Sequence, residues 1–287
     1  MVMRDFLFTI FTPMYNGRNT IDRVFQSLMN STYRNFEWIL VNDGSTDDSK
    51  EIVLKLIQDV DWVITYINWD KNKGKHIALN NAANIAKGDI FITLDCDDAL
   101  VSNALEFLNE HWNKYYDDRT IYGIDTLCID PNTNAICGSL FPYDNIKSNY
   151  GELYNKYKVW GDKLNSFRTE YMKKFPFPEI DANYYTECYL LYSLGEHYYS
   201  IGVNKVLRHY YQELNSITHT KKERINTVYM IIHYQKWHIP KVAMSLLKEN
   251  PRELCRCIKE LVLMQIKYRI MRFFKISEIT YNFNLFF

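Results

Sequence analysis

Three acidic residues follow directly after a short apolar run, in the segment Asp95-Cys-Asp-Asp98 behind Ile90-Phe-Ile-Thr-Leu94. At the end of a strand, the alternate residues Asp95 and Asp97 can project their carboxylates toward one cation. Adjacent carboxylates repel unless a proton or cation lies between them, and a hard divalent ion that also binds phosphate oxygens satisfies this need. A second interpretation stays open, because Asp97 and Asp98 also precede a helical stretch at 101–112 and suit its N-terminus.

Polar segments also end two earlier apolar runs, namely Thr12-Pro-Met-Tyr-Asn16 and Asn42-Asp-Gly-Ser-Thr46. Asp43 is a candidate acceptor for a hydrogen bond from a nucleobase or ribose, and Thr12 and Tyr15 are candidates to pack against one. Both segments equally suit ordinary turns, in which Gly44 supplies a positive φ. Ligands of open parallel sheets bind outside the carboxyl ends of the strands, so we expect the three segments to meet at one crevice.

The first hundred residues alternate between strand and helix patterns. The predicted strands are 6–11, 36–41, 62–67 and 90–94, and the predicted helices are 20–29, 47–58 and 75–86. Apolar strands joined by helices indicate a mainly parallel sheet that is covered on both faces. The expected fold class is therefore α/β, with a single Rossmann-like sheet and flanking helices.

The pattern changes after about residue 115. Residues 121–129 and 135–140 predict a strand pair, 154–177 a loop with short elements, 184–194 a helix and 205–211 a strand. From about residue 221 the chain is predicted to be mostly helix, interrupted at Pro240 and Pro251. We expect one domain made of two halves, 1–115 and 116–212, followed by a helical C-terminal extension at 213–287.

The composition excludes several classes of protein. The 287 residues contain 34 Lys and Arg against 34 Asp and Glu, so a protein that binds nucleic acid through its charge is not expected. No run approaches 18 apolar residues, so no transmembrane helix is expected, and the run before Thr12 predicts a strand rather than a signal peptide. Six cysteines without zinc or disulfide spacing predict free thiols in a reducing cytoplasm.

Four segments together resemble the family 2 glycosyltransferases, which are inverting enzymes with the type-A fold that use nucleotide-diphosphate sugars. They are Thr12-Pro-Met-Tyr-Asn16, Asn42-Asp-Gly-Ser-Thr-Asp-Asp-Ser49, Asn72-Lys-Gly-Lys-His-Ile-Ala-Leu-Asn80 and Ala86-Lys-Gly-Asp-Ile-Phe-Ile-Thr-Leu-Asp-Cys-Asp-Asp98. A looser set in the second half resembles a bacterial branch of that family that makes cell-envelope glycans. It comprises Gly161-Asp-Lys, Phe167-Arg-Thr-Glu170, Phe175-Pro-Phe-Pro-Glu179, Thr186-Glu187 and Asn204-Lys-Val-Leu-Arg208.

The resemblance implies a role for each matching residue on the donor side. Thr12, Pro13 and Tyr15 would line the nucleoside pocket, and Asp43 would contact uracil or an equivalent base. Lys75 would face the nucleotide or its diphosphate. Asp95 would hold ribose or metal-bound water, Asp97 would ligate Mn²⁺ or Mg²⁺, and Asp98 would border the donor sugar and acceptor. Residues 1–115 would thus be the nucleotide-sugar half, and 116–212 the acceptor half.

An inverting transfer also needs a base that takes the proton of the acceptor hydroxyl. The family often places an Asp within Glu-Asp at the start of a helix, where this chain has Thr186-Glu187-Cys188. The spacing of the residues that follow assigns the base to Glu187, with Asp181 and Glu179 as fallbacks, although Glu187 also suits a first helical turn. His219 is a candidate third metal ligand, since some type-A enzymes use a late histidine. Trp160 is either an acceptor contact or a rim aromatic.

The C-terminal segment from Arg252 to Phe287 carries seven Lys and Arg against three Glu, a net charge of +4. Basic and large apolar residues alternate there at helical spacing, which suits a helix on an anionic membrane or one docked on the core. The expected partners are a nucleotide-diphosphate sugar, which the resemblance implies to be a UDP-sugar, and a glycan or lipid-linked glycan. The expected location is the cytoplasm or the inner face of its membrane.

Three functions remain open on the sequence. The first is metal-dependent transfer of a single sugar; the chain lacks the Gln-x-x-Arg-Trp signature of polysaccharide synthases, which disfavours polymerisation. The second is a non-catalytic relative that binds nucleotide sugars or serves as a scaffold. The third is a sugar nucleotidyltransferase, which favours a Gly-rich basic loop after the first strand; Tyr15-Asn-Gly-Arg-Asn19 is a poor match to such a loop.

Overall fold

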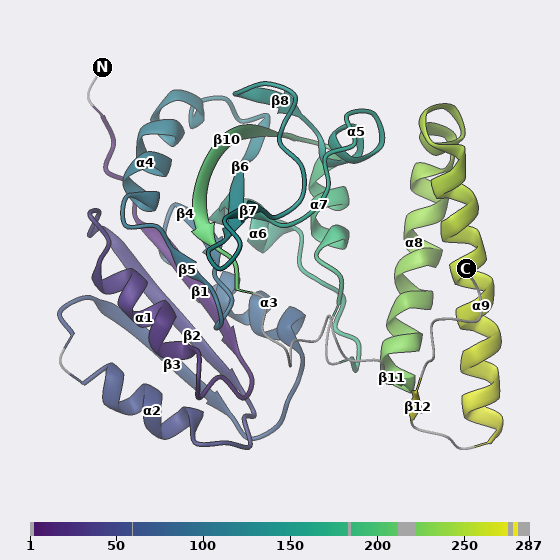
Figure 1. The fold of residues 1–287 in the computed structure, drawn as a ribbon, viewed down its shortest axis with the longest axis horizontal. Helices are drawn as coiled ribbons and strands as arrows, with labels where there is room; N and C mark the ends of the chain where they lie inside the picture. Colours follow the sequence, from purple (N-terminus) through teal and green to yellow (C-terminus); the bar gives the residue numbers. More distant parts are fainter. Residues whose placement is uncertain (1–2, 59, 183–184, 212–221, 275–277, 281–287) are drawn as a thin grey trace.

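The computed structural model describes residues 3–58, 60–182, 185–211, 222–274 and 278–280. A central sheet is flanked by helices, and a helical hairpin stands at one side of the molecule (Figure 1). The strands are β1 (Phe8–Met14), β2 (Phe36–Asp43), β3 (Val63–Trp69), β4 (Ile90–Thr93), β5 (Ala99–Leu100), β6 (Ile121–Asp130), β7 (Ala135–Ile136), β8 (Ile146–Ser148), β9 (Lys163–Arg168), β10 (Tyr199–His209), β11 (Lys222–Arg224) and β12 (Glu278–Thr280). The helices are α1 (Ile21–Met29), α2 (Ser49–Leu56), α3 (Lys75–Ile85), α4 (Ala104–Tyr115), α5 (Tyr150–Asn155), α6 (Thr169–Lys174), α7 (Cys188–Gly195), α8 (Ile225–Glu249) and α9 (Pro251–Phe273).

The main sheet of the described residues has the strand order β3-β2-β1-β4-β9-β6-β10-β5, with β7 beside β6 and β8 beside β10. Strands β3, β2, β1 and β4 run parallel, as do β6 and β10. Strand β9 runs antiparallel between β4 and β6 and joins the two parallel sets. The carboxyl ends of β1, β2 and β4 therefore meet at one edge, as predicted.

Alternate residues of the sheet supply two cores. Phe8, Ile10 and Trp38 point to one face, where they pack against α1 and α4. Phe11, Ile39 and Phe91 point to the other face, where they pack against α3, α6 and α7. Every residue of β1 and β2 is buried, which agrees with their mostly apolar sequences. The predicted α/β class, with a mainly parallel sheet between helices, is confirmed.

Several sequence predictions are wrong in detail. Segment 154–177 holds two short elements, β9 and α6, as predicted, but the sequence did not show that β9 is a strand of the main sheet, because it contains polar residues such as Lys163 and Asn165. The predicted helix at 101–112 begins only at Ala104, with Asn103 as its N-cap, because β5 comes first and pairs with β10. Asp97 and Asp98 therefore do not cap it. Helix α8 continues through Pro240, which is exposed on the helix surface.

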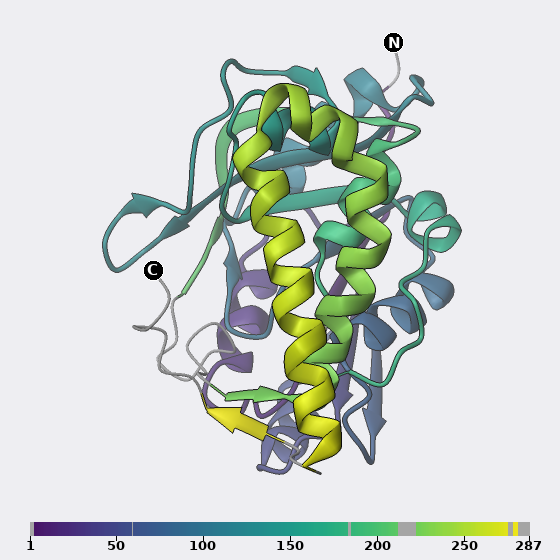
Figure 2. The same ribbon diagram turned by 90° about the vertical axis from the view of Figure 1, so that its right-hand side faces the viewer.

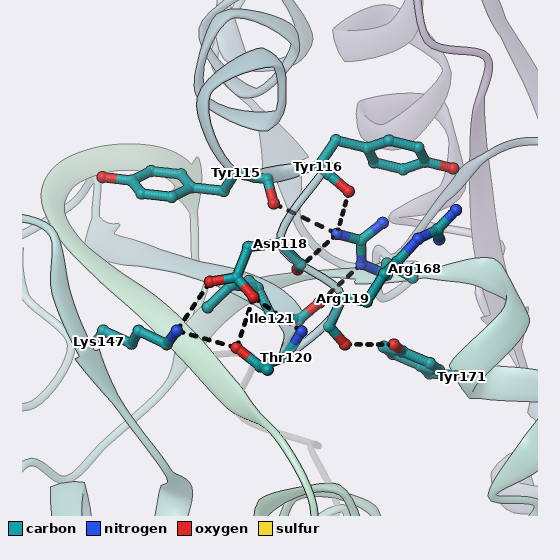
Figure 3. Close-up of polar contacts among 9 residues, drawn as sticks. All are labelled: Tyr115, Tyr116, Asp118, Arg119, Thr120, Ile121, Lys147, Arg168 and Tyr171. Carbon is teal, nitrogen blue, oxygen red and sulfur yellow. Dashed lines mark hydrogen bonds and ion pairs between the residues drawn. The ribbon is translucent and has the colours of Figure 1, made fainter.

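A buried arginine closes the end of α4. The side chain of Arg168 donates to the backbone carbonyls of Tyr115, Tyr116, Asp118 and Ile121, at the end of α4 and in the turn that leads to β6 (Figure 3). Its guanidinium lies 4.3 Å from the centre of the Tyr116 ring. Arg168 belongs to the Phe167-Arg-Thr-Glu170 segment of the family resemblance, and here its contacts are structural: they tie β9 to the loop before β6.

Helices α8 and α9 form a hairpin that docks on the core through α8 (Figure 2). Tyr189 of α7 packs against Trp237 with ring centres 4.6 Å apart, and Tyr192 packs against His238 at 4.4 Å. Helix α9 then packs on α8 through Leu261, Met264 and Met271. Cys255 is exposed and Cys257 buried, so the two thiols point to different sides, and all six cysteines are free.

Candidate active site

Lys75, the first residue of α3, forms ion pairs with one residue from each half of the domain, Asp95 and Glu187. Its Nζ lies 2.7 Å from Asp95 Oδ1 and 2.7 Å from Glu187 Oε1. Burial favours the neutral amine, but the two carboxylates outweigh it and hold the pKa of Lys75 well above its ordinary value. For Asp95, burial acts to raise the pKa and Lys75 overcomes it, so the carboxyl pKa is lowered. We call Lys75, Asp95 and Glu187 the charged triad.

Glu187 reaches the triad because the chain before α7 crosses over α3. Asn80 of α3 exchanges two hydrogen bonds with the backbone of Phe177, at 2.8 and 2.9 Å. The ring of His76 bonds the carbonyl of Ile180 at 3.1 Å. Glu187 then stands at the N-cap position of α7, yet its side chain makes no capping bond there. Its carboxylate faces Lys75 instead, while the fallback residues Glu179 and Asp181 are exposed on the crossing segment.

Asp43 organises the loop that leads into α3. Its carboxylate accepts hydrogen bonds from the backbone N–H groups of Lys73 at 2.6 Å and Gly74 at 2.9 Å. The loop fits tightly, because a Cβ on Gly44 would lie 2.5 Å from the backbone of Asn72. Burial raises the pKa of Asp43, and the two N–H donors partly offset that rise. Asp43 thus has a role in this turn and through the loop it positions Lys75, while its contact with a base stays a prediction.

The residues predicted to line the nucleoside pocket differ in exposure. Tyr15 is about half exposed beyond the end of β1. Pro13 is buried, and so is Thr12, whose hydroxyl accepts a hydrogen bond from Trp38 Nε1 at 3.0 Å. Asn16 joins the loops after β1 and β2, since its N–H donates to Ser45 Oγ and its side chain accepts from the N–H of Thr46. Tyr15 is the exposed member of this set.

Asp98, which is predicted to border the donor sugar, is buried in the structure. Its side chain is 1% exposed and lies against Arg208 of β10, with Oδ2 3.5 Å from Arg208 Nε. The N–H of Tyr211 donates to Asp98 Oδ1 at 3.1 Å. Burial raises the pKa of Asp98 to about 7 even though Arg208 opposes the rise. A carboxylate buried this deeply needs a cationic partner, and that need turns Asp98 inward.

Two arginines that the sequence analysis gave no role support the turn after β4. Arg208 holds Asp98, and Arg23 of α1 donates to the backbone oxygen of Asp97 and stacks 3.7 Å from the ring centre of Tyr211. Arg208 belongs to the Asn204-Lys-Val-Leu-Arg208 segment of the family resemblance, which is a signal that the sequence offered. Nothing in the sequence around Arg23, which lies on α1, indicates its contacts. Together they fix the backbone that presents Asp95 and Asp97.

The carboxylate oxygens in the crevice are the donors that Mg²⁺ and Mn²⁺ prefer. Asp97 is half-buried at the turn after β4. Among the described residues, no group of three or more His, Cys, Asp or Glu side chains is arranged to hold a metal ion. This donor set fits an ion that takes one or two protein carboxylates and completes its shell with phosphate oxygens. His219 lies outside the described residues.

Comparisons with solved structures give the fold. The chain superimposes on S. aureus TarS 1-349 in complex with UDP-GlcNAc with a TM-score of 0.61 and 15% identity, covering 91% of this chain and 73% of that one. A mannosyltransferase from Pyrobaculum calidifontis in complex with GDP-Man and Mn²⁺ matches with a TM-score of 0.55 and 17% identity, covering 90% of this chain and 68% of that one. The molecule thus has the type-A glycosyltransferase fold.

The sequence comparisons define the family. The sequence model described as "Glycosyl transferase family 2" matches residues 9–173, and the chain belongs to that family. It is 37% identical over 105 residues to the teichoic acid poly(glycerol phosphate) polymerase of Staphylococcus epidermidis, covering 37% of this chain and 15% of the polymerase. It is 31% identical over 149 residues to the Escherichia coli glucosyltransferase WfaP, named for UDP-Glc and a diphosphoundecaprenol acceptor, covering 49% and 57%. The chain thus spans less than two thirds of these relatives.

Proposed function

We propose that this protein is an inverting, metal-dependent glycosyltransferase that moves one sugar from a nucleotide-diphosphate donor to a hydroxyl of a glycan or lipid-linked glycan. The charged triad carries the proposal. In this triad the ammonium group of Lys75 lies between the carboxylates of Asp95 and Glu187. Asp95 comes from the donor half and lies where the parallel strands end. A transfer with a departing diphosphate needs a positive group and a base in such proximity.

On the donor side, Lys75 binds the diphosphate and Asp97 ligates Mn²⁺ or Mg²⁺ together with phosphate oxygens, with His219 proposed as a further ligand. When bound, the ion offsets the negative charge of the leaving diphosphate. Tyr15 packs against the nucleoside, and Asp43 keeps the loop before Lys75 in place. A uridine nucleotide is favoured by the names of TarS in complex with UDP-GlcNAc and of the UDP-Glc relative.

On the acceptor side, Glu187 takes the proton of the acceptor hydroxyl on its carboxylate. The acceptor oxygen forms a bond to the anomeric carbon, the bond from that carbon to the diphosphate oxygen breaks, and the diphosphate leaves with the electron pair. In the structure Glu187 is paired with Lys75. The donor diphosphate competes for Lys75, so donor binding frees Glu187 and sets an order in which donor binds before acceptor. Asp98 acts through Arg208 as a positioning residue.

The acceptor region is assigned to the second half of the sheet. Trp160 lies 62% exposed on a loop pinned by the close contact of Gly138 with Gly161. We extend the proposal to residues 1–115 as the nucleotide-sugar half, 116–212 as the acceptor half and 213–287 as a helical extension. Free cysteines agree with a reducing cytoplasm as the site of action. Two E. coli relatives named for diphosphoundecaprenol acceptors support a lipid-linked acceptor.

A donor screen tests the function. Purified protein is incubated with UDP-, GDP- and dTDP-sugars, with Mn²⁺ or Mg²⁺ and with or without a chelator, and release of free nucleoside diphosphate is measured. We expect release from one donor that chelation abolishes, with a UDP-sugar as the favoured case. The same donors are tested for thermal stabilisation of the protein. Binding without release, with acceptor glycans present, would favour the non-catalytic relative, and release of pyrophosphate from a sugar phosphate and a nucleoside triphosphate would favour the nucleotidyltransferase.

A further inference from the structure

The outer face of α9 is apolar although nothing in the described chain covers it. Helix α9 packs on α8 through the opposite face. Its exposed side chains include Ile258, Val262, Leu263, Ile266, Ile270, Phe273 and Phe274, which are between 45% and 81% exposed. At 3.6 residues per turn these positions fall within one arc of about 160°. With a rise of 1.5 Å per residue the arc is about 24 Å long.

Every exposed charge on this part of the chain is positive. From residue 258 to 274 the exposed side chains are the seven apolar ones and three cations, Lys259, Arg269 and Arg272. The two acids of α9 point elsewhere and are paired. Glu253 binds Arg256 at 2.9 Å, and Glu260 accepts a hydrogen bond from Gln235 of α8. The face thus combines a broad apolar arc with cations, a combination typical of helices that lie in a membrane interface.

We propose that the outer face of α9 binds an anionic lipid surface. Anionic headgroups neutralise Lys259, Arg269 and Arg272 while the apolar arc enters the boundary of the acyl chains. A second copy of the chain is the poorer occupant, because pairing this face with itself brings cations together without acidic partners. None of the helices in the part of the chain that the structure describes has the length and hydropathy of a membrane span.

The position of α9 suits the proposed function, although the proposed lipid contact does not depend on that function. The hairpin stands at one side of the molecule, with α9 outermost (Figures 1 and 2). The end of α9 that carries Phe273 lies at the lower end of Figure 1, as do the carboxyl ends of β1, β2 and β3. A membrane against α9 would therefore border the edge that holds the charged triad, where a lipid-linked acceptor must enter.

The test is flotation of the full chain with phosphatidylcholine vesicles that carry or lack phosphatidylglycerol. We expect binding that requires phosphatidylglycerol and weakens with salt. The variant Ile266→Glu with Ile270→Glu should abolish binding, and Lys259→Gln with Arg269→Gln and Arg272→Gln should weaken it on the order of a hundredfold, at roughly fivefold per cation. Leu54→Glu is the control, because Leu54 is a similarly exposed leucine on α2, at the opposite side of the molecule.

All substituted positions are exposed, so the variants should fold, and circular dichroism checks that they do. The proposal is overturned if folded wild-type protein stays unbound with phosphatidylglycerol, or if Leu54→Glu removes binding as fully as the α9 variant. It is also overturned if light scattering shows a dimer that Ile266→Glu with Ile270→Glu dissociates. Nucleoside diphosphate release without vesicles is measured in parallel and should be unchanged in the α9 variants, so failure of the lipid contact and failure of glycosyl transfer are separable.

Discussion

At the scale of single residues, Glu187 is the assignment with the sharpest consequence. Its carboxylate is half exposed and bound to Lys75 at 2.7 Å, next to the donor half. Glu187→Gln keeps the size and hydrogen-bonding capacity of the side chain but cannot accept the proton. We expect donor affinity to be retained and transfer to fall by about 10²- to 10⁴-fold. Acceptor glycosylation and donor binding are measured on the same preparation.

Glu179→Gln is the matched control, since Glu179 is an exposed glutamate on the segment that leads to Glu187. It should transfer at the wild-type rate. Near-normal transfer by Glu187→Gln, together with loss in Glu179→Gln or Asp181→Asn, would move the base to one of the fallback residues.

Each member of the charged triad was a candidate site residue in the sequence, but the contact between them could not be predicted. Lys75, Asp95 and Glu187 each matched a family position, whereas the approach of Glu187 to Lys75 depends on the crossing segment that Asn80 and His76 hold. Such contacts join residues about a hundred positions apart and leave no local pattern. Asp98 is the opposite case: its motif is clear, but no local pattern indicates its burial against Arg208.

At the scale of elements, Arg168 determines how α4 ends. Its side chain donates to four backbone carbonyls without a carboxylate partner, and burial lowers its pKa. Arg168→Met removes these four hydrogen bonds, although the carbonyls of Tyr115 and Asp118 each keep a backbone donor, and it also removes the cost of burying the charge. We expect a net loss of about 2 kcal/mol in the free energy of unfolding, measured by urea denaturation.

Arg119→Met is the matched control, because Arg119 is an exposed arginine paired with Glu170. Its loss should cost less than about 1 kcal/mol. Equal destabilisation by the two variants would show that the bonds of Arg168 to the end of α4 are not what stabilises the sheet junction.

The docking of α8 depends on an uncharged histidine. Burial lowers the pKa of His238 to about 4, from an ordinary value near 6.5. The unfolded chain therefore binds more protons between these values, so stability is complete above pH 6.5 and declines as pH falls toward 4. From pH 7 to pH 5 we expect a loss of about 2 kcal/mol. Denaturation at the two pH values checks this.

The control is His238→Phe, which retains the ring contact with Tyr192 but does not titrate. The difference between the two pH values should shrink by the same amount in this variant. An unchanged difference would assign the pH dependence to other groups.

At the scale of the whole molecule, the alternation of apolar runs and helices was enough to predict the α/β sheet and the edge at which its strands end. The antiparallel strand β9 and the short β5 were not predicted, because six polar-rich residues and two residues carry too little pattern. The course of α8 through Pro240 was also missed, since helix packing on α7 outweighs a local helix breaker. Local sequence patterns therefore predicted the helices and strands of the donor half more completely than those of the acceptor half.

The central claim is that the charged triad is the reactive centre, and one comparison of lysines tests it most directly. Lys75→Met and Lys71→Met remove lysines four residues apart, of which Lys75 joins Asp95 to Glu187 and Lys71 is exposed. Release of nucleoside diphosphate from the donor found in the screen should fall by about a hundredfold in Lys75→Met and stay near wild type in Lys71→Met. Wild-type release by a folded Lys75→Met protein would contradict the account and place the chemistry elsewhere.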